Sequence, residues 1–210
     1  MIDAALQPLQ RRMLAPVAGR MARAGICADH VSILGFVIGL GAVAALAMQA
    51  YMLALVLLLG NRLADGLDGA IARQGRPTDR GAFLDIALDF VFYALFPLGF
   101  AIGQPDQALP AAVLIAAFVG TGSSFLAFAA IAARRGTMPS RHGPKGIHYL
   151  GGLTEGAETI AVFALMCLWP AGFATLAYLF AAACLLTTLT RWHQGWLAFS
   201  PENDRTHRQE

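Results

Sequence analysis

Long apolar segments recur along the chain, separated by short polar ones. Segments of the length that spans a bilayer, about 20 residues, fall at residues 31–49, 51–72, 82–103, 109–132, 153–170 and 172–192. The fifth is the shortest, and several contain glycine or polar residues. The pattern predicts an all-α integral membrane protein with six transmembrane helices.

The first 24 residues have a different periodicity. Apolar residues recur every three or four positions, at Ile2, Leu6, Leu9, Met13, Val17 and Met21. Arginines occupy other positions on the helical wheel, so the segment predicts an amphipathic helix on the membrane surface. A cleaved signal peptide is not expected, because no continuous apolar core follows a basic start. A frayed leader is the alternative.

Composition and charge agree with a bilayer location. Hydrophobic residues make up 57% of the chain and charged residues 13%, against about 25% charged in soluble domains. With six spans and a cytoplasmic N-terminus, every Lys and Arg falls on the cytoplasmic side, as the positive-inside rule requires. We therefore expect both termini in the cytoplasm, in a single domain that comprises an interfacial helix (1–24), a membrane core (31–192) and a polar cytoplasmic tail (193–210).

Four aspartates lie near the predicted cytoplasmic ends of the second and third spans. Asp65 and Asp68 are three residues apart, and Asp85 and Asp89 are four apart. On a helix each spacing puts both side chains on one face, so two adjacent antiparallel helices can direct four carboxylates to one point. Charges at this depth cost several kcal/mol unless they are compensated. Two divalent cations would neutralise them, and all-oxygen ligation favours Mg²⁺ or Mn²⁺.

The residues around these acids are small, and a cation follows them. Gly66, Gly69 and Gly81 leave the helix faces bare, so a bulky ligand can approach the backbone, although small residues also serve helix packing. Arg73 follows Gly69 by one turn and can fork onto a phosphate, although an arginine at the end of a span also anchors topology. The combination predicts a site for a phosphate-bearing ligand.

These residues resemble the signature of the CDP-alcohol phosphotransferase family, DxxDGxxAR followed by GxxxDxxxD. All eight defining residues are present, from Asp65 to Arg73 and from Gly81 to Asp89. The segment between Arg73 and Gly81 is one residue shorter than in the usual form. Because it is a turn that contains glycine and proline, we expect the turn to absorb the difference.

The resemblance implies roles for each of these residues. Asp65, Asp68 and Asp85 would ligate two metal ions, and Asp89 would contribute to ligation and act as the general base. Gly69, Arg73 and Gly81 would hold the CDP moiety. The family fold has six transmembrane helices and is usually a homodimer.

The implied reaction is a metal-dependent transfer in phospholipid biosynthesis. A phosphatidyl-type group would pass from a CDP-linked lipid, such as CDP-diacylglycerol, to the hydroxyl of a small alcohol, with release of CMP. The basic residues predict a site that faces the cytoplasm, in an integral protein of a bacterial inner membrane. No nucleic-acid partner is expected.

The acceptor alcohol is left open by the sequence. A phosphorylated alcohol would suit Arg134, Arg141, Lys145 and Arg191, but each of these residues also suits topology or headgroup anchoring. Glu155 and Glu158 lie three apart at the start of the fifth span, where acceptor contacts and helix-to-helix hydrogen bonds are equally plausible. Asp29 and Ser32 open the first span, where helix capping by one of them is the simplest role and a place near the nucleotide is the alternative.

Two other classes of protein use similar residues. An intramembrane prenyltransferase uses paired aspartates, metals and a lipid diphosphate, but its motifs normally lie on separated helices without the DGxxAR element. An ion transporter can use acidic side chains as its binding site. Metal-dependent release of CMP distinguishes the phosphotransferase from both.

Overall fold

The computed structural model describes residues 2–75, 77–135 and 154–200, and those residues form helices joined by short connections. The α-helices are α1 (Ile2–Arg23), α2 (Ala28–Ala47), α3 (Tyr51–Gln74), α4 (Asp79–Gly103), α5 (Ala108–Arg134), α6 (Gly156–Leu168) and α7 (Phe173–Ala198). Two short 3₁₀ helices, η1 (Pro105–Gln107) and η2 (Pro170–Gly172), precede α5 and α7. No strand occurs among the described residues, so the all-α prediction is confirmed.

Four helices in the described part of the chain are long and apolar enough to cross a membrane: α2, α4, α5 with η1, and α7 with η2. Helix α3 has the length, but its second half carries the charged motif. Helix α6 has 13 residues, about 20 Å at 1.5 Å per residue, which is less than the hydrocarbon thickness of about 30 Å. The fifth predicted span, 153–170, is therefore longer than its helix.

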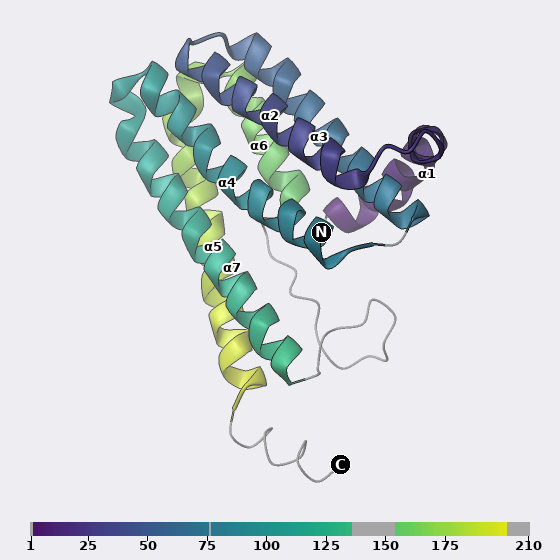
Figure 1. Cartoon of the computed structure of the whole chain (residues 1–210). Coiled ribbons are helices and arrows are strands. Elements are labelled where there is room, and N and C mark those ends of the chain that lie inside the picture. Colours follow the sequence, from purple (N-terminus) through teal and green to yellow (C-terminus); the bar gives the residue numbers. More distant parts are fainter. Residues whose placement is uncertain (1, 76, 136–153, 201–210) are drawn as a thin grey trace.

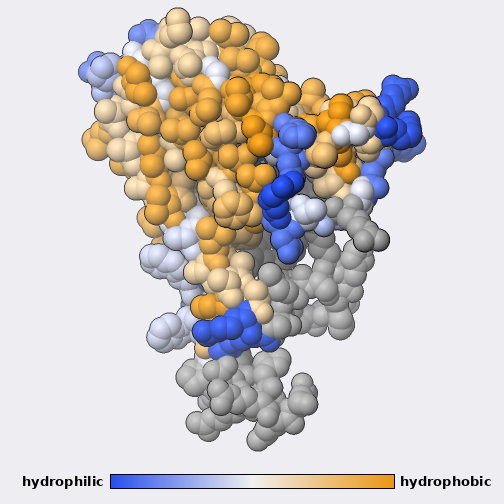
Figure 2. All heavy atoms as spheres, in the orientation of Figure 1, coloured by the Kyte–Doolittle hydropathy of each residue, from blue (hydrophilic) through white to orange (hydrophobic). Residues whose placement is uncertain are grey.

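The outer surface of the bundle is apolar. Figure 2 shows hydrophobic side chains over most of the visible face of the helices, with hydrophilic ones toward α1 and at the two ends of the bundle. Leu34, Val56 and Leu179 are each more than half exposed on three different helices. Such a surface suits lipid rather than water, and the chain is an integral membrane protein.

The interior is a packed aromatic core. Phe96 of α4 stacks on Phe163 of α6 with ring centroids 4.1 Å apart, and Phe92 meets Phe163 edge to face. Phe118 of α5 contacts the same ring. Close aromatic packing of this kind fixes α4, α5 and α6 relative to one another, and α4 carries half of the aspartate motif.

Helix α1 stands apart from the bundle in Figure 1 and packs against the end of α3. Ala18 is fully buried there, and Gln74 of α3 donates a hydrogen bond to the Ala15 carbonyl (2.8 Å). Met13 and Val17 remain exposed. The helix of the predicted amphipathic segment is thus present, and its apolar exposed residues are compatible with a membrane surface.

Candidate active site

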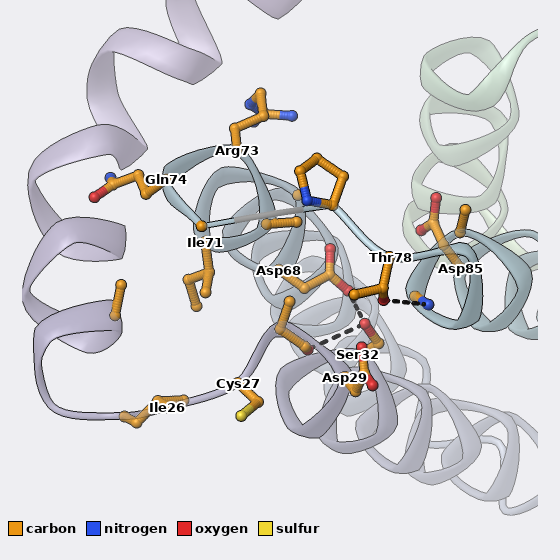
Figure 3. A pocket seen from close by; sticks show the side chains of 18 of the residues that line it. Ile26, Cys27, Asp29, Ser32, Asp68, Ile71, Arg73, Gln74, Thr78 and Asp85 are labelled. Carbon is orange, nitrogen blue, oxygen red and sulfur yellow. Dashed lines mark hydrogen bonds between the residues drawn. The ribbon is translucent and has the colours of Figure 1, made fainter.

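A pocket with several charged side chains in its wall opens where two helices end and two begin. It has a volume of about 1080 Å³ and lies between the end of α1, the start of α2, the end of α3 and the start of α4. Asp68, Asp85 and Ser32 lie along one part of its wall, and Arg73 lies on the far side (Figure 3). The two halves of the aspartate motif therefore meet at one cavity.

Three aspartates come together in this pocket and are called here the acidic cluster: Asp65, Asp68 and Asp85. One carboxylate oxygen from each lies within 4.8 Å of the other two. Asp68 is buried, Asp65 is half-buried and Asp85 is exposed. The Ser32 hydroxyl donates a hydrogen bond to Asp68 Oδ2 at 2.5 Å, which fixes the most buried carboxylate. The spacing on α3 and the approach of α4 produce this arrangement.

The acidic cluster fits a hard divalent cation. Oxygen ligands bind Mg²⁺ at about 2.1 Å, so opposite ligands on one ion stand about 4.2 Å apart. The separation of up to 4.8 Å in the cluster is closed by a small rotation of an exposed carboxylate such as Asp85. The donors are all carboxylate oxygens, the chemistry that Mg²⁺ and Mn²⁺ prefer.

Asp89, the fourth motif aspartate, is held by other partners. Its Oδ1 accepts a hydrogen bond from Arg62 Nη2 at 2.7 Å, and its Oδ2 lies 3.4 Å from the Tyr93 hydroxyl. Arg62 Nη1 also lies 3.6 Å from Asp65 Oδ2. The structure thus brings Asp65, Asp68 and Asp85 together and sets Asp89 beside them in an ion pair with Arg62.

Arg62 is held by Gly35, Asn61, Phe92 and Tyr93, which are together called here the socket. Its Nε donates to Asn61 Oδ1 at 2.9 Å, and Asn61 Nδ2 donates to the Gly35 carbonyl of α2 at 2.9 Å. Its guanidinium lies over the Phe92 and Tyr93 rings, 5.7 and 5.8 Å from their centroids. The side chain is only 17% exposed. The charge pattern of the sequence grouped Arg62 with the other basic residues of the cytoplasmic side, and the structure places its side chain between Asp65 and Asp89.

The motif glycines make room for charged neighbours. A Cβ at Gly69 would lie 3.2 Å from Arg73 Nη1, so the guanidinium folds back over the bare face of α3. A Cβ at Gly81 would lie 3.2 Å from both Asp29 Oδ1 and Thr78 Oγ1. Thr78 caps α4 by accepting a hydrogen bond from the Gly81 amide (3.1 Å). Glycine therefore lets the pocket wall approach the backbone at both positions.

Asp29 and Ser32 do not cap α2, so that prediction is wrong. Cys27 holds the cap position without a side-chain hydrogen bond. Asp29 instead pairs with Arg80 of α4 (Nη2 to Oδ2, 2.5 Å), and Ser32 binds Asp68. Asp29 and Ser32 are the second and fifth residues of α2, past the cap position, and both line the pocket.

The predicted acceptor residues fall into different surroundings. Arg191 of α7 is buried, donates to the Thr121 carbonyl of α5 at 3.1 Å and lies over the Phe125 ring. Glu155 interacts electrostatically with Arg191. Glu158 is half-buried in the first turn of α6, and Arg134 is exposed in the last turn of α5. Arg141 and Lys145 lie outside the described residues.

Helix α6 begins close to the Asp89 side of the site. A Cβ at Gly156 would lie 3.5 Å from the Tyr93 hydroxyl, which contacts Asp89. The start of α6, with Glu155 and Glu158, therefore adjoins the predicted base. Neither Tyr93 nor Arg62 is among the site residues that the sequence predicted. Their only signal was spacing: Arg62 precedes Asp65 by three residues and Tyr93 follows Asp89 by four.

Comparison with known proteins gives consistent matches. The sequence model of the CDP-alcohol phosphatidyltransferase family matches residues 26–197. The inner membrane protein YnjF of Escherichia coli is 50% identical over 94% of this chain and 96% of its own length. Archaetidylinositol phosphate synthase of Methanothermobacter thermautotrophicus is 35% identical over 46% of this chain and 49% of its own length.

The fold also matches solved structures. The crystal structure of Mycobacterium tuberculosis phosphatidylinositol phosphate synthase with CDP-DAG bound has a TM-score of 0.66 and 25% identity, covering 90% of this chain and 96% of that one. The same enzyme in complex with manganese and citrate has a TM-score of 0.64 and 24% identity, covering 90% of each chain. At 24% identity, the second comparison shows a similarity of fold alone.

Proposed function

The chain belongs to the CDP-alcohol phosphatidyltransferase family, and we propose that it transfers a phosphatidyl-type group from CDP-diacylglycerol or a similar CDP-linked lipid to a small alcohol, releasing CMP. The observation that carries the proposal is the acidic cluster on the wall of a pocket that also holds Gly69, Arg73 and Gly81. A family member of this kind is a phosphotransferase enzyme, which sets aside the transporter and the prenyltransferase.

Asp65, Asp68 and Asp85 would hold the divalent cations, Mg²⁺ or Mn²⁺. Bound there, the cations would neutralise the diphosphate and stabilise charge on the departing CMP. A manganese complex of the phosphatidylinositol phosphate synthase supports this choice of metal. Arg73, folded over Gly69, is positioned to fork onto a phosphate, and Gly81 leaves the start of α4 open to the ligand.

Asp89 would be the general base. Its Oδ1 is held by Arg62, whereas Oδ2 has only the long contact with Tyr93 and keeps accepting capacity. An alcohol hydroxyl that donates its proton to Oδ2 could then attack the lipid-side phosphorus in line. The ion pair with Arg62 fixes the orientation of the Asp89 carboxylate, so that Oδ2 faces the acceptor.

The acceptor would enter from the side of α6. Glu155 and Glu158 lie at the start of this helix, next to Tyr93, and Arg191 adds a cation that interacts with Glu155. Two of the relatives are synthases of inositol phosphate lipids. We therefore propose a phosphorylated polyol as the first acceptor to test, with serine and unphosphorylated polyols as the next.

The membrane arrangement is part of the proposal. We propose six membrane crossings, in which α3 is the most polar helix and α6 the shortest. This arrangement places every Lys and Arg on the cytoplasmic side, together with the pocket. The relative named an inner membrane protein supports that membrane as the location. We also propose that the protein is a homodimer, as is usual in the family.

The decisive experiment supplies purified protein in nanodiscs with CDP-diacylglycerol, Mn²⁺ or Mg²⁺ and one alcohol at a time. The panel contains inositol phosphate, glycerol phosphate, inositol, glycerol and serine, and mass spectrometry identifies the lipid product. We expect CMP and one new phosphodiester lipid, loss of both in EDTA, and recovery with added Mn²⁺. Full turnover in metal-free buffer, or no CMP with any acceptor, would contradict the proposal.

A further inference from the structure

Arg62 lies where the acidic cluster meets Asp89. Its Nη2 is 2.7 Å from Asp89 Oδ1 and its Nη1 is 3.6 Å from Asp65 Oδ2. The guanidinium thus spans two of the four motif carboxylates, one inside the cluster and one outside it. Any cation that binds Asp65 and Asp89 together must compete with this side chain.

The position of Arg62 is imposed by its surroundings. Asn61 is buried and joins the Arg62 Nε to the backbone of α2 at Gly35. A Cβ at Gly39 would lie 2.9 Å from the Phe92 ring and 3.1 Å from Asn61 Nδ2, so glycine there leaves room for the socket. The rings beneath the guanidinium add cation–π attraction. The socket therefore holds the arginine against the carboxylates before any ligand arrives.

The charge of the site limits how many cations it takes. Four carboxylates, one guanidinium and one divalent cation leave a net charge of −1. A second divalent cation changes this to +1 in a low-dielectric setting, where like charges repel strongly. A diphosphate ligand brings negative charge that removes the excess. The first cation is thus favoured in the free protein, and the second is not.

We propose that Arg62 is a positioning residue that holds Asp89 in place of a second cation, so that the free protein binds one divalent cation strongly and a second one only weakly. The strong site is the acidic cluster, and the weak one draws on Asp89, whose Oδ1 already accepts a hydrogen bond from Arg62. The inference rests on the proposed function, because it takes the acidic cluster as a cation site.

The test is a Mn²⁺ titration of the full-length protein in nanodiscs without nucleotide, with free Mn²⁺ counted by electron paramagnetic resonance. Wild-type protein shows one strong and one weak class of site. In Arg62→Gln the weak class tightens by about tenfold, the effect of losing one charge-assisted hydrogen bond. The strong class changes less, because Arg62 is farther from Asp65 than from Asp89.

Arg80→Gln is the matched control. It removes an arginine that is also paired with an aspartate, Asp29, in the same pocket, and both classes keep their wild-type affinities. Arg62→Lys keeps the charge but cannot fork, and it gives a weak class between those of wild type and Arg62→Gln. This variant also carries the test if Arg62→Gln does not fold.

Three results would overturn the inference. An unchanged weak class in Arg62→Gln and Arg62→Lys, beside normal Mn²⁺ binding by wild type, defeats the role of Arg62 and leaves the proposed function intact. If the weak class binds Mn²⁺ equally more tightly in Arg80→Gln, the effect comes from the loss of any positive charge near the pocket and not from Arg62. Absence of Mn²⁺ binding in every variant, with turnover retained, defeats the metal role and this inference together.

Discussion

Two polar regions lie within the apolar bundle, and they differ in how far their polar groups find partners within the protein. The first, at the ends of α3 and α4, contains four carboxylates with Arg62 as the cation in direct contact with two of them. The second, between α6 and α7, consists mainly of hydroxyls. Thr154 donates to Thr187 (3.1 Å), and Thr187 and Thr188 donate to carbonyls one turn earlier on α7.

The difference separates a site for a ligand from a structural contact. Negative charge in the first region exceeds what its protein neighbours supply, so its balance requires cations from outside. The hydroxyls of the second region find partners within the protein, and their burial costs little. Changes in the first region should therefore abolish chemistry, and changes in the second should mainly lower stability.

Asp68→Asn should have the largest effect. The amide keeps the size of the side chain but removes a charge from the most buried carboxylate of the acidic cluster. We expect transfer to fall by about 1,000-fold, the scale of losing a charge-stabilising group, with weaker Mn²⁺ binding. Asp79→Asn, an exposed acid on α4 outside the pocket lining, is the control. If Asp68→Asn releases CMP at a rate within tenfold of wild type, the first region is not the site of the chemistry and no longer differs from the second.

Asp89→Asn should be next. Loss of a general base lowers turnover by about 100-fold or more, whereas the acidic cluster and Arg73 remain, so binding of the CDP-linked lipid should be largely kept. Single-turnover CMP release measures the first quantity and equilibrium binding of a CDP-lipid the second. Retained turnover would show that another group accepts the proton.

Gly69→Ala tests the open helix face. The added Cβ would lie 3.2 Å from Arg73 Nη1, so the guanidinium must move, and we expect KM for the CDP-linked lipid to rise by about tenfold. Gly60→Ala on the same helix is the control, since its Cβ makes only an ordinary contact with Ile38 at 3.4 Å. Equal KM values for the two variants would mean that the position of Arg73 does not matter for binding.

Thr187→Val should have the smallest effect on activity. It removes the hydrogen bond between Thr154 and Thr187 and should lower the free energy of unfolding by about 1 kcal/mol, with turnover kept. Thr190→Val, an exposed hydroxyl on the same helix, should change stability by less than about 0.5 kcal/mol. Thermal denaturation in detergent and CMP release give the two readouts. A large loss of turnover in Thr187→Val would make the second region part of the active site.

The parts of the site that depend on local spacing could be predicted. Asp65 and Asp68 share a helix face because three residues make about one turn, and Asp85 joins them because a short turn reverses the chain between α3 and α4. Helix α6 was less predictable. Its apolar residues continue past Leu168, but Trp169 and Pro170 end the helix, so the run of hydrophobicity was longer than the element.

The partners of Asp89, Asp29 and Ser32 could not be predicted in the same way. Arg62 is far from Asp89 in sequence, and its distance depends on how closely α3 packs on α4. Gly35 sets the contact between α2 and α3, because a Cβ there would come within 2.8 Å of Ala64 Cβ. Pairs across helices arise from such packing, which periodicity does not report.

By itself the sequence determined a membrane-embedded helical chain, the two halves of an aspartate motif and the glycines and arginine beside them. These follow from hydrophobic length and from spacing along single helices, which are local properties. Only the tertiary structure decided that Asp89 lies beside the other three aspartates in an ion pair with Arg62. The physical reason is that charges choose partners by distance in space, and helix packing sets that distance.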